Sequence, residues 1–195
     1  MDRIKLGFAL CGSFCTFSRA IAQMEQLVAL GYEVTPIMSF HAYETDTRFG
    51  KAADFVAQAE KISGHSVLHT LTDTEPIGPK RMFDLLAVVP CTGNTLAKLA
   101  LGIVDTPVTM AVKSHLRIAR PVVIAVSTND ALSNSAKNIG ALMNRKHYFF
   151  VPMSQDNFEK KPTSVVADFD KLALTISAAL ENRQLQPILC NGVLQ

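Results

Sequence analysis

The sequence has no long apolar run and no cluster of basic residues, although 48% of its 195 residues are hydrophobic and 18% are charged. No uninterrupted apolar stretch approaches the roughly 20 residues that a membrane-spanning helix needs. The formal net charge is only +2, and Lys and Arg are spread along the chain, so nucleic acid is not an expected partner. The apolar segment 4–14 is short and lacks the cleavage site of a signal peptide. We therefore expect a soluble protein of the cytoplasm.

Cysteine and histidine are scarce and do not form the patterns that bind metals or build disulfide scaffolds. No Cys-x-x-Cys pair is present, and the density of cysteine is far below that of a disulfide-rich domain. The five histidines lack the short spacings of zinc ligands. We expect free thiols and no structural metal. The cysteines are Cys11, Cys15, Cys91 and Cys190.

Two glycine-rich nucleotide motifs, G-x-G-x-x-G and G-x-x-x-x-G-K-[ST], are also absent, which argues against a dinucleotide Rossmann site and a P-loop. The short loop 11–16, Cys-Gly-Ser-Phe-Cys-Thr, nevertheless joins a predicted strand to a predicted helix. Its backbone N–H groups and the hydroxyl of Ser13, beside Gly12, could approach an anion at the helix start. A tight turn capped by Ser13 is the alternative. If a nucleotide binds, a mononucleotide fits this loop better.

What the sequence does contain is a regular alternation of predicted strands and helices. This order is typical of an α/β fold in which helices cover both faces of a mostly parallel sheet. The length suits a single domain, 1–195, with a core at about 4–181 and a flexible C-terminal tail. The segment 72–79 holds two prolines and a glycine and predicts a loop. Strands are predicted at 4–10, 33–38, 66–69, 84–89, 122–126 and 148–151, the last of them, and helices at 18–30, 54–62, 96–101, 134–143 and 167–181.

Polar residues follow the carboxyl ends of four predicted strands. Gly12 and Ser13 follow the first strand, Ser39 the second, 91–95 the third strand of clear apolar character and 127–130 the strand after it. In open α/β sheets, ligands bind beyond the carboxyl ends of the strands, where the winding reverses. We therefore expect these loops to line one common site.

The segment 90–105 is the most informative one: Pro-Cys-Thr-Gly-Asn-Thr-Leu-Ala-Lys-Leu-Ala-Leu-Gly-Ile-Val-Asp. Thr92, Asn94 and Thr95 offer donors and acceptors at a helix start, which suits the polar edge or ribityl chain of a flavin. An ordinary capping turn is the alternative. The segment resembles the signature P-A-S-A-N-T-x-A-K-x-A-x-G-x-x-D of the FMN-binding flavoprotein family. That family includes phosphopantothenoylcysteine decarboxylase, peptidyl-cysteine decarboxylases and prenyl-FMN-forming enzymes.

The resemblance extends over residues 4–151 and implies a flavodoxin-like (Rossmann-like) three-layer sandwich with FMN as cofactor. Gly12 and Ser13 match the first phosphate loop of the family, and Ser39 matches its second-strand hydroxyl. It also implies a homo-oligomer, a trimer or larger. The cofactor-binding residues that it implies are Gly12, Ser13, Ser39, Cys91, Thr92, Gly93, Asn94, Thr95 and Thr109.

The chain departs from the catalytic patterns of this family in two places. Decarboxylases have a histidine shortly before the strand that leads into the Asn-Thr motif, whereas segment 75–79, Glu-Pro-Ile-Gly-Pro, has none. Prenyl-FMN synthases place an arginine where this chain has Met110. Both activities therefore lose support. Glu75 is the one carboxylate expected near the site and is the candidate base, with a solvated loop glutamate as the alternative.

Segments 75–79 and 91–95 together are most similar to a branch of the family whose members act beside an NAD(P)-binding protein. This resemblance implies one component of an oxidoreductase for a small cyclic dicarboxylate, with NADP on the partner. The alternatives are a non-catalytic stabilising or regulatory partner and an FMN-dependent decarboxylase. Lys113 could attract a dicarboxylate, with a solvated helix face as the alternative. Segment 127–130 replaces the P-x-M-N clamp of the decarboxylases. The substrate candidates are Lys113, Ser127, Thr128 and Asn129.

Overall fold

The computed structural model describes residues 3–190, and its centre is a sheet of seven strands. Five of them are parallel and lie in the order β2-β1-β3-β4-β5. This is the strand order of flavodoxin-like doubly wound folds, so the predicted fold class is confirmed. The parallel strands are β1 (Lys5–Leu10), β2 (Glu33–Met38), β3 (Leu85–Cys91), β4 (Val122–Thr128) and β5 (Tyr148–Phe150).

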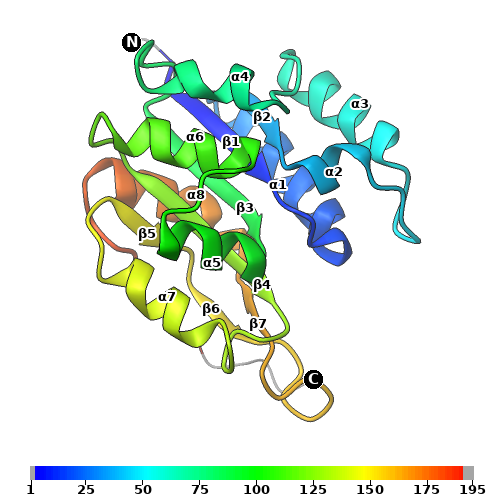
Figure 1. Ribbon diagram of the computed structural model, residues 1–195, viewed down its shortest axis with the longest axis vertical. Helices are drawn as coiled ribbons and strands as arrows, with labels where there is room; N and C mark the ends of the chain where they lie inside the picture. Colours follow the sequence, from blue (N-terminus) through cyan, green and yellow to red (C-terminus); the bar gives the residue numbers. More distant parts are fainter. Residues whose placement is uncertain (1–2, 191–195) are drawn as a thin grey trace.

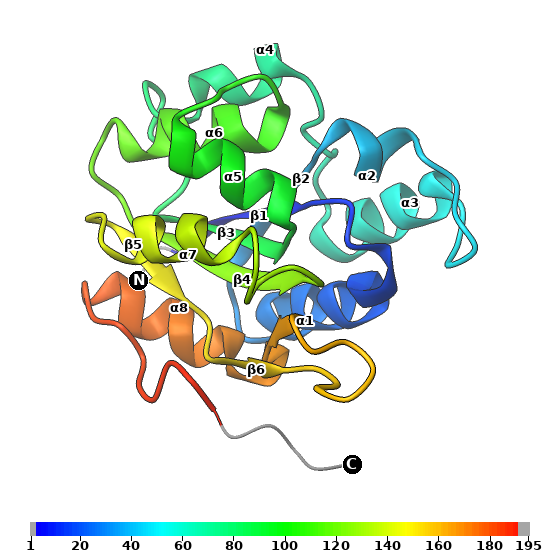
Figure 2. The same ribbon diagram turned by 60° about the horizontal axis from the view of Figure 1, so that its bottom comes forward.

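Helices cover both faces of the sheet, which makes three layers (Figures 1 and 2). On one face lie α1 (Phe17–Ala29), α8 (Leu172–Leu180) and, packed against α1, α3 (Ala52–Ser63). On the other face lie α5 (Gly93–Leu101), α6 (Pro107–Leu116) and α7 (Ala136–Met143). Between residues 3 and 190, no helix is both long and apolar enough to cross a membrane. The short elements are α2 (Phe40–Glu44), α4 (Leu71–Thr74), η1 (Phe14–Thr16), η2 (Glu75–Ile77) and η3 (Phe169–Lys171).

Alternate side chains of the parallel strands supply the two cores. Leu6, Phe8 and Leu10 of β1 pack with the helices of the α1 face, whereas Val122 and Ile124 of β4 pack with those of the α6 face. Strands that are buried on both sides need apolar residues at almost every position. That requirement explains why these strands are continuous apolar runs in the sequence.

The predicted loop at 72–79 is wrong, because the chain there forms α4 and the 3-10 helix η2. A capping box starts α4: the Thr70 hydroxyl accepts from the Asp73 N–H, and the Asp73 carboxylate accepts from the Thr70 N–H. Pro76 lies in the first turn of η2, where a missing N–H costs nothing. The predicted strand at 66–69 is reduced to a single bridge between Leu68 and Ile37.

The strand β5 is not the last one, contrary to the prediction. An antiparallel hairpin follows, made of β6 (Met153–Gln155) and β7 (Val165–Ala167), and the predicted helix at 167–181 therefore begins only at Leu172. β5 pairs only with the first three residues of β4, which leaves the far end of β4 unpaired on that side. There β7 pairs antiparallel with Ser127 and Thr128, so the hairpin extends the sheet beside the end of β4.

The chain after α8 returns to the sheet edge. The side-chain amide of Gln184 donates to the carbonyl of Phe150 and accepts from its N–H, both at 2.7 Å. Further along, the Met153 N–H donates to the Ile188 carbonyl, and the Cys190 N–H donates to the Met153 carbonyl. The predicted flexible tail is thus held to β5 and β6 as far as Cys190, and its last residues, 191–195, lie outside the described part of the chain.

His115 makes the stability of this fold sensitive to acid. It is fully buried, and burial lowers its pKa to about 4, with the nearby charge of Arg120 acting in the same direction. An imidazole in the unfolded chain titrates near 6.5, so the unfolded state binds the extra proton between the two values. The contribution of the neutral, buried imidazole to the free energy of unfolding is complete above about pH 6.5, and it decreases by roughly 3 kcal/mol on acidification to pH 4.

Urea denaturation at several pH values checks this expectation. His115→Leu should show a flatter decline of unfolding free energy between pH 6.5 and 4 than the parent, whatever its stability at neutral pH. Parallel curves for the two proteins would contradict a neutral, buried His115.

Candidate functional site

Two cavities open side by side at the carboxyl ends of the parallel strands. The first, which we call the switch cavity, has a volume of about 480 Å³, and its wall includes Gly12, Ser39, His41, Thr92, Asn94, Thr95 and Thr106. The second, the hairpin cavity, has a volume of about 380 Å³, and its wall includes Gly12, Ser13, Arg19, Thr92, Ser127, Asn129 and Lys161. Because Gly12 and Thr92 line both, ligands in the two cavities would be neighbours.

The switch cavity lies where the order of the strands reverses. Gly12 follows β1 and Thr92 follows β3, and the chain winds outward in opposite directions from these two adjacent strands. This is the position at which doubly wound sheets bind their ligands. The predicted common site is therefore two adjoining cavities, and the switch cavity has the volume of an ordinary small-molecule pocket.

Threonines cap the two longer helices that begin at the switch cavity. The hydroxyl of Thr92 accepts from the Thr95 N–H at 3.3 Å and starts α5 at Gly93, three residues before the predicted helix start. Thr106 caps α6 in the same way, accepting from the Thr109 N–H at 3.2 Å. The first N–H groups of a helix have no partner within it, and the helix dipole is positive there. The wall at Thr92 and Thr106 therefore favours an anion.

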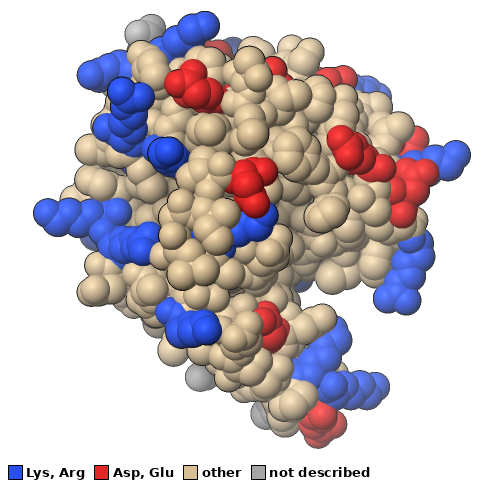
Figure 3. All heavy atoms as spheres, viewed as in Figure 1, with Lys and Arg blue, Asp and Glu red and all other residues tan. Residues whose placement is uncertain are grey.

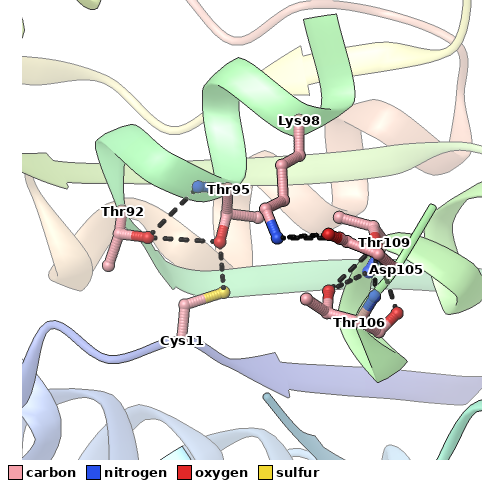
Figure 4. A network of polar contacts seen from close by, with 7 residues as sticks. All are labelled: Cys11, Thr92, Thr95, Lys98, Asp105, Thr106 and Thr109. Carbon is pink, nitrogen blue, oxygen red and sulfur yellow. Dashed lines mark hydrogen bonds and ion pairs between the residues drawn. The ribbon is translucent and has the colours of Figure 1, made fainter. Parts of the chain in front are cut away.

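A network of polar contacts fixes this wall (Figure 4). Thr92 donates from its hydroxyl to that of Thr95 at 3.1 Å, and Thr95 donates to the sulfur of Cys11 at 3.3 Å. The ammonium group of Lys98 on α5 lies 2.7 Å from the carboxylate of Asp105, the residue before the cap of α6. These contacts join α5 to the residue after β1 and to the segment that leads into α6.

Asn94 takes no part in this network. Its side chain is exposed on the wall of the cavity and makes no hydrogen bond with a described residue. An amide offers both donors and an acceptor. Asn94 is thus the polar side chain of α5 that is available to a ligand.

The thiols of Cys11 and Cys91 are fully buried. Burial raises the pKa of the Cys11 thiol to about 11 and raises the pKa of Cys91 well above its ordinary value. Both therefore stay protonated near neutral pH and are poor nucleophiles. Cys91 packs in the core beneath α5 and α6, so it lies behind the switch cavity and not on its wall.

Hydroxyl groups form the floor of the hairpin cavity. The Ser13 and Ser127 hydroxyls are 2.9 Å apart, and the buried hydroxyl of Thr16 donates to the Ser13 carbonyl at 2.8 Å. Arg19, from the first turn of α1, and Lys161, from the hairpin, line the cavity as well. The molecular surface is indented on the right of Figure 3, between the hairpin below and the body of the molecule above.

Gly93 has a packing role. A Cβ atom there would lie 2.8 Å from side-chain oxygens of Thr128, Asp130 and Ser135. Those oxygens form their own network, since Thr128 and Ser135 both donate to the Asp130 carboxylate, at 2.6 and 2.9 Å. Glycine therefore allows the start of α5 to approach the loop after β4.

The structure brings together nine of the sequence-predicted site residues, in two groups. Four of them line only the hairpin cavity, and Gly12 and Thr92 line both cavities. The residues of the switch cavity are Gly12, Ser39, Thr92, Asn94 and Thr95, and those confined to the hairpin cavity are Ser13, Ser127, Thr128 and Asn129.

Three other predicted residues lie elsewhere. Thr109 and Lys113 line a separate apolar cavity between α5 and α6, and the Thr109 hydroxyl serves the cap of α6. Glu75 lies on η2, exposed and on the wall of neither cavity, and its backbone carbonyl accepts from Ser114. The two cavities therefore contain no Glu75 carboxylate and no Lys113 ammonium group.

Several residues that line the two cavities were not predicted from the sequence. Thr106 had a recognisable signal, because a Thr-Pro pair before an apolar segment marks a capped helix start. Arg19, Asp156 and Lys161 had none, since their meeting depends on the hairpin folding over the end of β4. His41 is the one imidazole among the residues that line the two cavities.

The chain is similar to known proteins in both sequence and fold. A model of the flavoprotein family matches residues 1–180. The B subunit of dipicolinate synthase from Bacillus subtilis strain 168 is 44% identical over 185 residues, which span 95% of this chain and 92% of that protein. The crystal structure of the B subunit of dipicolinate synthase from Bacillus halodurans C has a TM-score of 0.89 at 40% identity, covering 98% of this chain and 99% of the other. The crystal structure of the FMN-dependent cysteine decarboxylase SpaF is 20% identical in sequence and has a TM-score of 0.67. The match covers 92% of this chain and 97% of the other, which shows a shared fold.

Proposed function

Since this chain belongs to the flavoprotein family, we propose that it is the B subunit of a dipicolinate synthase. In this role it acts in the cytoplasm of a sporulating cell with the A subunit of dipicolinate synthase, which carries NADP, to oxidise dihydrodipicolinate to dipicolinate. The observation that carries the proposal is 44% identity to a protein of that name over 95% of this chain and 92% of the other. We also expect a homo-oligomer, a trimer or larger.

The switch cavity fits FMN as the cofactor. The phosphate of FMN would lie against the loop at Gly12 and the helix starts at Thr92 and Thr106, where backbone N–H groups favour an anion. The Asn94 amide would bind the polar edge of the ring or the ribityl chain, and the Ser39 hydroxyl would add a further contact. The one carboxylate on this wall, Asp105, is neutralised by Lys98, so it does not repel the phosphate. When bound, FMN would supply an acceptor for the hydride that leaves the dihydro ring.

A second candidate function is that of a non-catalytic partner that stabilises or regulates the NADP-carrying protein. It is favoured by the absence of a free carboxylate among the described residues that line the cavities. Asp105 is paired with Lys98 and Asp156 with Lys161, while Glu75 lies outside both cavities. In this alternative, the proton acceptor and the hydride acceptor would both come from the partner.

Titration of the purified chain with FMN, followed by its visible absorption spectrum, tests the cofactor. We expect saturable binding with one FMN per chain and a shifted flavin spectrum that bleaches on reduction. Unchanged free-flavin spectra at all concentrations would contradict FMN binding and leave the non-catalytic partner as the function.

Activity of the mixed complex separates the two candidates. The A subunit should convert dihydrodipicolinate to dipicolinate faster when it is mixed with the FMN-loaded chain than when it is mixed with the flavin-free chain. Equal rates would show that the flavin takes no part in the oxidation.

A further inference from the structure

Arg19 is a cation without a carboxylate partner in the described part of the chain. It lies in the first turn of α1 and lines the hairpin cavity, and no ion pair of residues 3–190 includes it. Its guanidinium group lies over the ring of Phe169, 4.8 Å from the centroid. Such stacking restricts the orientation of the guanidinium and leaves its edge free to donate hydrogen bonds. Arg19 is therefore preorganised to bind an acceptor.

The other charged groups of this cavity nearly cancel. Lys161 and Asp156 both line it, and their charged atoms are 2.8 Å apart. Arg19 thus gives the wall of the hairpin cavity its net positive charge. An unpaired cation on a concave wall favours an anionic ligand.

The floor of the cavity can satisfy a second acidic group. The hydroxyls of Ser13, Thr16 and Ser127 converge there, with Ser127 and Thr16 only 4% and 6% exposed. A carboxylate that leaves water needs several hydrogen-bond donors to replace its hydration. Thr16 already donates to the Ser13 carbonyl, whereas the Ser13 and Ser127 hydroxyls, which are bonded to each other, can turn to donate toward a carboxylate oxygen. The floor and Arg19 are thus two separate places where a carboxylate can bind.

We propose that the hairpin cavity binds the planar dicarboxylate on which the complex acts, with Arg19 holding one carboxylate and the hydroxyl floor receiving the other. The identity of the ligand rests on the proposed function. The volume of about 380 Å³ suits a single six-membered ring with two carboxyl groups. Gly12 and Thr92, which line both cavities, place this ligand directly beside the flavin in the switch cavity.

Binding of dipicolinate to the FMN-loaded chain, measured by calorimetry, tests this site. Arg19→Gln removes the charge and the fork of donors from an exposed helix position and is expected to weaken dipicolinate binding by about thirtyfold. Arg19→Lys keeps the charge without the fork and should fall between the parent and Arg19→Gln. FMN affinity of both variants should stay at the parent value, because Arg19 does not line the switch cavity.

Arg48→Gln is the matched control. Arg48 also stacks on a phenylalanine, with its guanidinium 4.9 Å from the centroid of the Phe49 ring, and it lines neither cavity. This variant loses the same charge, so it should bind dipicolinate like the parent. Equal weakening in both variants would mean that only the overall charge matters and would overturn the site.

Pyridine-2-carboxylate, which has one carboxyl group, tests the second contact. It should bind the parent more weakly than dipicolinate does, because only one of the two carboxylate positions is filled. An FMN-loaded parent that binds no dipicolinate, or an Arg19→Gln variant that binds it as tightly as the parent, overturns the proposal. Arg19-dependent binding in a chain whose complex with the A subunit oxidises nothing would support the site and reject the proposed function.

Discussion

The substitution Asn94→Asp is expected to weaken FMN binding by about a hundredfold, because it places a negative charge on the wall that faces the flavin. The Asn94 amide has no hydrogen bond to a described residue, so no internal contact is lost with it. Asp is also favourable in the first turn of a helix, and Asn94 is the second residue of α5. The fold should therefore remain intact while flavin affinity, measured by absorption titration, decreases.

Asn129→Asp makes the same chemical change on the wall of the hairpin cavity. It should leave FMN binding close to the parent value and reduce dipicolinate binding, the reverse of the pattern expected for Asn94→Asp. If Asn94→Asp binds FMN as well as the parent, the flavin does not contact α5 and the assignment of the switch cavity fails. If it binds no flavin but the complex with the A subunit keeps its activity, the non-catalytic partner is the better interpretation.

Gly78→Ala is expected to lower the free energy of unfolding by about 3 kcal/mol, at the upper end of the usual cost of overpacking. A Cβ atom at Gly78 would lie only 2.0 Å from the backbone carbonyl oxygen of Ser114. The Gly78 N–H also donates to the Ser114 hydroxyl at 2.8 Å, which in turn donates to the Glu75 carbonyl. Relief of the clash would require movement of α6 away from η2, with loss of these bonds.

Thermal denaturation followed by circular dichroism measures the effect, and the melting temperature should decrease by about 6–12 °C. Gly140→Ala is the matched control, because Gly140 lies inside α7 and a Cβ atom there would meet nothing within 4 Å. Alanine in a helix interior is more stable than glycine by about 0.5–1 kcal/mol, so this variant should melt slightly higher than the parent. A Gly78→Ala protein that melts at the parent temperature would contradict the close packing of η2 on α6.

The parallel sheet could be predicted because burial on both faces leaves a direct trace in the sequence. β1, β3 and β4 are continuous apolar runs, and helical periodicity in the segments after β1 and β4 defines α1 and α7. The hairpin left no such trace. β6 and β7 have only three residues each, which is too short for an alternation of polar and apolar residues to become visible. A polar segment also separates them. The prolines near α4 concealed a helix whose start depends on a local capping box.

The switch cavity was predictable to the extent that topology decides it. Gly12, Ser39 and Thr92 follow neighbouring strands, and the carboxyl ends of parallel strands meet at one edge of a sheet. The hairpin cavity was only half predictable: its floor at Ser127 lies at the carboxyl end of β4, but Lys161 comes from the unpredicted hairpin. Glu75 was misplaced because the segment that contains it packs on α6 as a helical turn and does not extend toward the strand ends.

The side chain of Gln184 closes the exposed edge of the sheet at β5. Its amide supplies one donor and one acceptor to Phe150, the pair of contacts that the backbone of an added strand would make. Unpaired edge strands are templates for aggregation, and proteins commonly protect them by keeping them short or covering them. β5 is only three residues long and carries this cover as well. A further strand could join here only after displacing Gln184, so growth of the sheet into fibrillar assemblies is opposed at this edge.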